Sequence, residues 1–347
     1  MTRNGRRPTL RDIADRVGVS EAAASFALNG KPGLSEETRR RVLEVVEELD
    51  WRPSHAARAL SGAKAQTIGL AIARPATASD AELFFMRLMT GLQSALGPAQ
   101  FGLLIQIVDD IDDEVEMYRR WHAERRVDGV IVVNLRAHDP RPQLLADLEM
   151  PAVLAGGPDP TGLIPSASID DGAAMHAVLR HLHDEGHDRV TYLCGAPDIV
   201  HVRRRIEAFE STLMDGTFDG EFRPTAFTAR AAEEAVIALL SSDRAPTAVI
   251  CDNEVLAVSV ELTARNRGLR VPHDLAIVSC EDGPICEAMS PPLTALHRDT
   301  EGFGADAASM LLRIISGHEA ESAQETVPGL VVRGSTVLQE SSTAARG

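Results

Sequence analysis

The chain has 347 residues, of which 44% are hydrophobic and 25% charged, which is enough for a small module joined to a larger core. No segment approaches the roughly 20 consecutive apolar residues of a membrane-spanning helix, and no apolar run follows the basic N-terminus, so we expect a cytoplasmic protein without a membrane partner. The net charge of −16 argues against nucleic-acid binding by the chain as a whole.

The charge is divided unevenly along the chain. Residues 1–65 contain 12 Lys or Arg against 9 Asp or Glu, whereas residues 66–347 contain 23 against 42. A mildly basic module on an acidic body is typical of a small domain that touches DNA phosphates while the body avoids them. A solvated helical module without a nucleic-acid role would have the same charge.

Three short helices are predicted in the basic module. Thr9 is an N-cap candidate for the first helix, and Gly18 stands where a C-terminal cap belongs. Ser20 begins a second helix that ends at Leu28, and Ser35 begins a third. Two helices joined by a three-residue turn and followed by a third helix are typical of a helix-turn-helix domain.

The second of these helices has two different faces. At about 100° per residue, one side is predicted to pack in the core and consists of Ala24, Ala27 and Leu28. The other side is small and polar, with an aromatic residue at its margin, and consists of Ala22, Ser25, Asn29 and Phe26. Such a face fits a DNA major groove, where Glu21 can accept from cytosine and apolar groups can meet a thymine methyl. Phe26 is either an apolar reader of this kind or a plug against the domain itself.

The segment from Thr9 to Gly62 closely resembles the DNA-binding headpiece and hinge of the LacI/GalR family of bacterial transcription regulators. The resemblance implies that the second helix is the recognition helix and that bases are read by Glu21, Ala22 and Phe26. It also implies that phosphates are contacted, or their contacts supported, by Thr9, Ser20, Ser25 and Asn29.

The recognition helix departs from the family pattern at three positions. The family has Thr and Val before the central Ser and Arg after it, where this chain has Ala23, Ala24 and Phe26. The missing Arg removes the commonest bidentate contact to guanine, so the family's typical operator does not carry over to this chain.

A short hinge is predicted over residues 54–65. Pro53 is a helix start signal and Ser61-Gly62 a stop signal, but seven or eight residues do not hold a helix alone in water. A flexible linker is the alternative. The resemblance implies a hinge helix that folds as a pair on DNA, with Leu60 wedged into the minor groove; Ala57 is a second predicted DNA contact in this helix.

The rest of the chain alternates apolar strands with amphipathic helices, which predicts parallel α/β sheets. The pattern resembles the two-lobed, periplasmic-binding-protein-like effector domain of the same family. The predicted domains are a helix-turn-helix headpiece over 1–53, the hinge and linker over 54–65, and an effector-binding and dimerisation domain over 66–340. Its N-lobe is expected at about 66–166 plus 298–326, and its C-lobe at about 167–297 plus 327–340.

Effector-binding residues are expected at the carboxyl ends of the strands, in the cleft between the lobes. Arg205 matches a family arginine that grips effector hydroxyls or carbonyls, with Arg203 as a neighbour, although three consecutive arginines could also form a solvated helix face. Glu281 takes a place commonly held by Asp, and Asp252-Asn253 reverses the usual Asn-Asp.

Aromatic residues complete the predicted cleft. Phe84, Phe85 and Phe227 match positions where aromatic rings line the family's cleft, with core packing as the alternative.

No catalytic, cofactor or metal motif accompanies these residues. The four cysteines have neither CxxC spacing nor a histidine cluster beside them, so we expect buried thiols, no cofactor and no enzyme. The sequence therefore predicts a transcriptional repressor that binds a pseudo-palindromic operator in double-stranded DNA as a homodimer. A small-molecule effector controls it, most commonly a sugar in this family. The alternative is a small-molecule-binding protein of the periplasmic type without a transcriptional role.

Overall fold

The computed structural model describes residues 8–28, 31–51, 64–73, 83–225, 227–323 and 325–337. The chain forms two compact units, Met1–Ala65 and Gln66–Gly347. Among the described residues, every helix is too short or too polar to cross a lipid bilayer.

The first unit is a helix-turn-helix domain, as predicted. Its helices are α1 (Leu10–Val17), α2 (Glu21–Leu28) and α3 (Glu36–Glu48). Thr9 and Asp12 form a capping box at the start of α1, and Gly18 ends this helix in the left-handed conformation with a φ of 77°. The helices pack around a small apolar core of Ile13, Val17, Ala27 and Val42.

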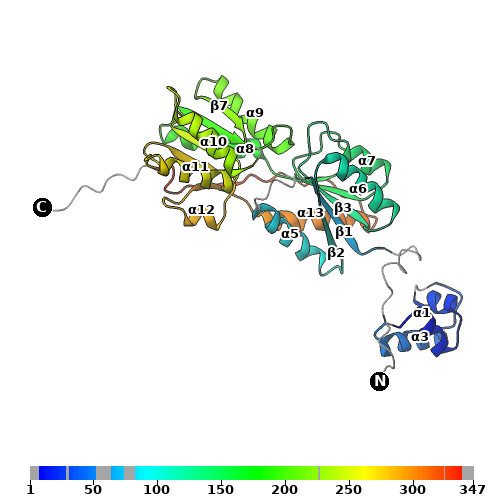
Figure 1. Cartoon of the computed structure of the whole chain (residues 1–347). Helices are drawn as coiled ribbons and strands as arrows, with labels where there is room; N and C mark the ends of the chain where they lie inside the picture. Colours follow the sequence, from blue (N-terminus) through cyan, green and yellow to red (C-terminus); the bar gives the residue numbers. More distant parts are fainter. Residues whose placement is uncertain are drawn as a thin grey trace. The chain divides into compact units, whose positions relative to one another are not determined.

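The second unit contains two sheets with helices on both faces (Figure 1). The first sheet is parallel, in the order β2-β1-β3-β4-β5. Its strands are β1 (Thr67–Ala73), β2 (Gly102–Val108), β3 (Gly129–Val133), β4 (Ala152–Gly156) and β5 (Ser166–Ser168). The second sheet has the order β11-β10-β9-β8-β6-β7, with β11 antiparallel to β10. Its strands are β6 (Arg189–Cys194), β7 (Asp219–Pro224), β8 (Ala248–Cys251), β9 (Ala276–Ser279), β10 (Thr294–His297) and β11 (Gly329–Val331).

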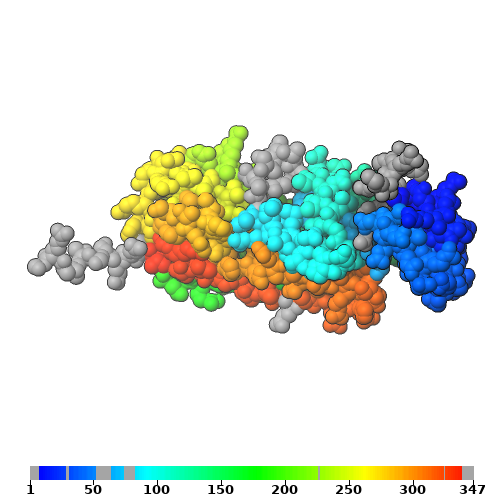
Figure 2. All heavy atoms as spheres, turned by 90° about the horizontal axis from the view of Figure 1, so that it is seen from below, coloured from blue at the N-terminus to red at the C-terminus, as the bar shows by residue number. Residues whose placement is uncertain are grey.

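The helices of the second unit connect and cover these strands. They are α5 (Leu83–Leu96), α6 (Ile111–Ala123), α7 (Arg141–Asp147), α8 (Asp171–Asp184), α9 (Val200–Met214), α10 (Ala229–Leu240), α11 (Glu254–Asn266), α12 (Pro284–Ala288) and α13 (Thr300–Ile315). Although they are far apart in sequence, α5 and α13 pack side by side, and Figure 2 shows α13 in orange beside the cyan of α5. The parallel α/β architecture agrees with the alternation of strands and helices in the sequence.

The chain crosses between the sheets three times. It leaves the first sheet after Ser168 and returns after His297, and it passes to the second sheet again before β11. Ile169 and Thr326 form a parallel bridge that joins two of these crossovers. Arg204 of α9 binds the Ile169 carbonyl at 3.0 Å and the Glu325 carboxylate at 2.8–2.9 Å, so the crossovers are tied to the second lobe.

Candidate functional site

Helix α2 exposes two residues of the face that the sequence predicted to be open. Ala22 and Phe26 are exposed, whereas Ala24 and Ala27 are buried in the headpiece. The Phe26 ring is 42% exposed, so it is not a plug of the headpiece core. Glu21 is exposed at the start of the helix, where its carboxylate complements the helix dipole.

The hydroxyl-bearing candidates begin helices or flank the exposed face. The Thr9 hydroxyl donates to the Asp12 carboxylate at 2.7 Å and caps α1. The Ser20 hydroxyl accepts from the Ala23 amide at 3.2 Å, and Ser25 is half-buried. The other predicted DNA contacts lie outside the described residues: Asn29, Ala57 and Leu60, together with the hinge helix.

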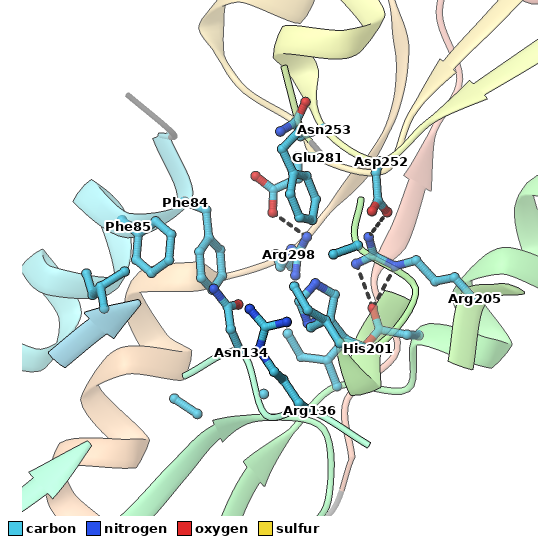
Figure 3. A pocket seen from close by; sticks show the side chains of 18 of the residues that line it. Phe84, Phe85, Asn134, Arg136, His201, Arg205, Asp252, Asn253, Glu281 and Arg298 are labelled. Atoms are coloured by element: carbon cyan, nitrogen blue, oxygen red, sulfur yellow. Dashed lines mark hydrogen bonds and ion pairs between the residues drawn. The ribbon is translucent and has the colours of Figure 1, made fainter. Parts of the chain in front are cut away.

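The second unit contains a cavity of about 310 Å³ between its two sheets, at the carboxyl ends of the strands (Figure 3). This is where parallel sheets position ligands, because the strand order reverses there at β1 and β6. Seven of the eight predicted effector-binding residues line it: Phe84, Phe85, Arg205, Phe227, Asp252, Asn253 and Glu281.

Arg203 is the exception and requires a correction. It is exposed on α9 and does not line the cavity. Two residues along a helix rotate a side chain by about 200°, so Arg203 and Arg205 of the same helix cannot face the same cavity. We therefore remove Arg203 from the candidate effector-binding residues.

Arg205 lies in a buried ion-pair triad with two aspartates. Its Nε and Nη2 donate to Asp171 at 2.9 and 2.6 Å, and its Nη1 donates to Asp252 at 2.5 Å (Figure 3). The Tyr192 hydroxyl and the Gly195 amide donate to Asp252 at 2.6 and 2.8 Å. Burial acts to raise the pKa of Asp171, but the nearby positive charges, led by Arg205, exceed this effect and lower it. Asp171 is therefore ionised at neutral pH and forms a buried ion pair with Arg205.

A second ion pair lies on another wall of the cavity. Arg298 pairs with Glu281 and donates to the Cys280 carbonyl at 3.3 Å. The Arg298 guanidinium also lies 5.3 Å from the centre of the Phe84 ring, within the range of a cation–π contact. Arg298 follows β10 of the second sheet and Phe84 belongs to α5, so this contact lies where the chain crosses between the two sheets.

Two cavity-lining side chains have buried N–H donors without a partner. Asn253 uses its Oδ1 to cap α11 at the Leu256 amide, 3.0 Å away, while its Nδ2 has no partner. The Nε of Arg136 is also buried and has no hydrogen-bond partner. An unpaired buried donor is costly, so both atoms are candidates for binding acceptor oxygens of a ligand.

The aromatic side chains that line the cavity are positioned by different contacts. Phe84 and Phe85 meet edge to face, with ring centroids 5.4 Å apart. Phe227 has a φ of 61°, and its ring packs on Gly195, where an added Cβ would lie 1.9 Å from the Phe227 Cζ. Gly195 is therefore required for the Phe227 ring to reach the cavity.

Several residues that line the cavity were not predicted from the sequence: Asn134, Arg136, Asp171, His201, Arg298 and Phe303. For some of these residues, the nearby sequence could have indicated a position in the cavity. His201 lies four residues before Arg205 on α9 and so shares its helix face, and Asn134 is the first polar residue after β3. Asp171 and Arg298 also follow strands, β5 and β10, but nothing local in the sequence predicts that they pair with Arg205 and Glu281.

A backbone bridge between the lobes spans one edge of the cavity. The Ala137 amide donates to the Asp198 carbonyl at 2.9 Å, and the Val200 amide donates to the Leu135 carbonyl at 2.8 Å. The Arg136 guanidinium pairs with the Asp198 carboxylate at the same place. We call this group of contacts the rim bridge.

His201 gives the unit a testable pH dependence. Burial, and then the charge of Arg205, lowers the pKa of His201 from 6.5 to about 4. Because the unfolded chain binds the proton more readily, the stability that neutral His201 contributes is present above about pH 6.5 and is lost as the pH falls towards 4. Urea unfolding between pH 7.5 and 4.5 should therefore depend less on pH in His201→Gln than in the parent chain.

His122→Gln is the matched control, because His122 is exposed on α6. Burial also lowers the pKa of His181 and His187, and both are retained in the two variants. An unchanged pH dependence in His201→Gln would show that His201 is not buried in its neutral form.

The thiols and acids do not form a metal site in the described part of the chain. All four cysteines are free and buried, as predicted, and burial raises the pKa of Cys194 and Cys280 to about 12. No group of three or more His, Cys, Asp or Glu residues that could hold a metal ion occurs among the residues described.

Comparison with known proteins agrees with both units. Residues 9–54 match the family model of bacterial regulatory proteins, lacI family, and residues 179–336 match a periplasmic binding protein-like domain. The HTH-type transcriptional repressor PurR of Aliivibrio salmonicida is 30% identical over 94% of this chain and 98% of its own length.

Two solved structures are similar as well. A LacI family transcriptional regulator from Bifidobacterium animalis subsp. lactis is 33% identical over 79% of this chain and 98% of its own, with a TM-score of 0.72. A complex of the regulator CelR with cellobiose is 26% identical over 95% of this chain and all of its own, with a TM-score of 0.69. The chain thus belongs to the LacI family of bacterial regulatory proteins, and its relatives are transcriptional regulators, not enzymes.

Proposed function

We propose that this LacI-family repressor binds a pseudo-palindromic operator as a homodimer and that an uncharged, sugar-like effector in the cavity controls the binding. The observation that carries the proposal is the cavity itself. The cavity lies between the two lobes, and the arginines that line it are paired with carboxylates of the protein. The same chain has a helix-turn-helix domain with an exposed helix face. Such a regulator acts in the cytoplasm, where the operator DNA is.

Operator binding is supported by the surface of α2. Its exposed face carries short side chains, Ala22 among them, which allow a helix to approach base edges in the major groove. We expect Ala22→Glu to weaken binding to a selected operator by a factor on the order of one hundred, because a carboxylate would face phosphates and base acceptors.

Selection of binding sites from random duplex DNA, followed by titration of the selected operator, tests this. Leu43→Glu is the control, since Leu43 is similarly exposed but belongs to α3. If the parent chain enriches no sequence, or if Ala22→Glu binds the operator as tightly as the parent, the proposed function is wrong.

A homodimer is supported by exposed apolar side chains on both lobes. Ile105 and Ile107 lie on the same face of the edge strand β2, and Ile107 is 65% exposed. On the second lobe, the exposed side chains of Leu262 and Ile285 line a groove along α11. Apolar surface of this kind is typical of protein–protein interfaces.

The double variant Ile107→Glu/Ile285→Glu should therefore be monomeric where the parent chain is dimeric. Two charges buried at such an interface are expected to raise the dimer dissociation constant by at least a factor of about ten. Sedimentation equilibrium measures this constant. Met214→Glu is the control, because Met214 is 88% exposed but isolated at the end of α9. If the double variant dimerised as tightly as the parent chain, these two faces would not form the dimer interface.

An uncharged effector is supported by the pairing of the charges. Arg205 has Asp171 and Asp252 as partners, and Arg298 has Glu281, so neither offers an uncompensated positive charge to an anion. The rim residue Arg136 is likewise paired, with Asp198.

Carbohydrate chemistry is supported by the unpaired donors. The free Nδ2 of Asn253 and Nε of Arg136 suit hydroxyl or ether oxygens, and the aromatic walls suit the apolar face of a sugar ring. CelR, the related regulator solved in complex with cellobiose, is consistent with this class of ligand.

A thermal-shift screen of neutral saccharides, sugar phosphates and purines tests the effector class. A stabilising saccharide should also change operator affinity, because effector binding shifts the balance between two lobe arrangements and so decides whether the paired hinge helices form. If only sugar phosphates or purines stabilised the protein, the proposal of an uncharged, sugar-like effector would be wrong. Stabilisation without an effect on operator affinity would contradict the coupling.

A further inference from the structure

We propose that Phe26 and Lys31 act together as a reader of one thymine and its neighbouring phosphate, in place of the arginine that family members carry after the central serine. The inference rests on the proposed operator binding by α2 and adds the identity of a base and the residues that select it.

The Phe26 side chain is positioned to meet a base and not the protein core. The neighbours Ala24 and Ala27 on α2 are buried, whereas Phe26 is 42% exposed and lies outside the headpiece core. A phenyl ring forms no hydrogen bond with a base edge. The thymine methyl is the apolar group that the major groove presents, so Phe26 selects thymine by packing against that methyl.

Lys31 supplies a positive charge beside this ring. Its Nζ lies 5.6 Å from the centre of the Phe26 ring, within the range of a cation–π contact. Its main chain is fixed on both sides: the Lys31 amide donates to the Phe26 carbonyl at 3.0 Å, and the Lys31 carbonyl accepts from Arg39 of α3 at 2.9 Å. The ammonium group thus lies beside the ring that meets the base, on a fixed stretch of main chain.

Phe26 and Lys31 together provide the base contact and the positive charge that a single arginine provides in the family pattern. A guanidinium provides both charge and a bidentate donor pair that fits guanine, whereas a lysine ammonium is a point charge suited to a phosphate. Phosphate contacts position the protein without reading sequence, and base contacts specify it. Phe26 therefore carries the preference for thymine, and Lys31 carries affinity that is independent of sequence.

Selection of binding sites from random duplex DNA with the full chain tests these separate roles of Phe26 and Lys31. The parent chain is expected to fix thymine at one position in each half-site. Phe26→Arg should change that base to guanine, and Phe26→Ala should lose the preference there. Leu43→Ala, an equally exposed apolar residue on α3, should leave the selected sequence unchanged. Thermal unfolding of each variant should match the parent, because both side chains are exposed.

Replacing the selected thymine in one half-site by deoxyuridine removes only one methyl group. For the parent chain this change should weaken binding about fourfold, the effect of losing one buried methyl, and for Phe26→Ala it should have no effect. Lys31→Ala should keep the preference for thymine, bind all sequences more weakly, and reduce the dependence of log affinity on log salt by about two units, one for each subunit of the dimer.

Several results would overturn the inference. Selection of guanine by the parent chain, or equal affinity for thymine and deoxyuridine, would exclude Phe26 as a methyl reader. An unchanged salt dependence in Lys31→Ala would exclude the phosphate contact. Failure of the parent chain to select any sequence would refute operator binding itself, and the inference with it.

Discussion

Arg205→Met is expected to destabilise the unit Gln66–Gly347 by about 3–5 kcal/mol, the cost of removing one partner from a buried ion pair. The arginine is the shared partner of Asp171 and Asp252, which are both almost fully buried. Without it, two carboxylates are left uncompensated and close together. One of them must become protonated or gain water, and both changes cost free energy.

Urea unfolding followed by circular dichroism measures the loss, and Arg203→Met is the matched control. Arg203 is on the same helix but is exposed, so its replacement should change the free energy of unfolding by less than about 0.5 kcal/mol. Adding Asp252→Asn to Arg205→Met removes one uncompensated charge and should recover part of the lost stability. Equal stability of the parent chain and Arg205→Met would contradict the buried triad.

Arg141→Met is expected to have an effect of similar size, about 3–5 kcal/mol, in the first lobe. Arg141 is buried and donates to Glu114 at 2.7 Å and to Asp139 at 2.7 and 2.9 Å. Glu114 also accepts from the Tyr118 hydroxyl at 2.5 Å, and burial raises its pKa. Removing the arginine leaves two acids without their cation.

The same variant should also loosen one wall of the cavity. Arg141 donates to the Asn134 carbonyl at 3.0 Å, and its partner Asp139 accepts from the Arg136 amide at 2.9 Å, so this cluster holds the loop that carries two cavity-lining residues. Hydrogen exchange of residues 134–137 should increase beyond the increase expected from global destabilisation.

Arg119→Met is the control for this variant. Arg119 is an exposed arginine of α6 whose pair with Glu116 spans 3.5 Å at the surface, and such pairs contribute little to stability. A loss of stability in Arg119→Met equal to that in Arg141→Met would show that burial of the pair is not the cause.

The headpiece could be predicted almost completely because its signals are local. Thr9, Gly18, Ser20 and Ser35 mark the ends of helices through caps that involve only near neighbours in sequence. The two faces of α2 follow from helix periodicity alone. Local signals of this kind need no knowledge of the tertiary fold.

The cavity could be predicted only in part. Arg205 was found by its resemblance to a family position, and helix periodicity, which separates it from Arg203, could also have identified His201. The roles of Asp171 and Arg298 depend on where α8 and β10 lie in three dimensions. The pairing of Arg205 with two acids, which decides the charge that a ligand meets, therefore required the structure.

The rim bridge has a consequence for the speed of the response. Its two backbone hydrogen bonds and its ion pair must separate before a molecule can pass between the lobes at this edge. A ligand that takes this route should associate more slowly than in a diffusion-limited encounter, because it waits for the bridge to open. Its departure by the same route waits for the same opening. Along this route, the delay between the disappearance of a signal and the change in transcription depends on residues 135–137 and 198–200 as well as on the groups that bind the ligand.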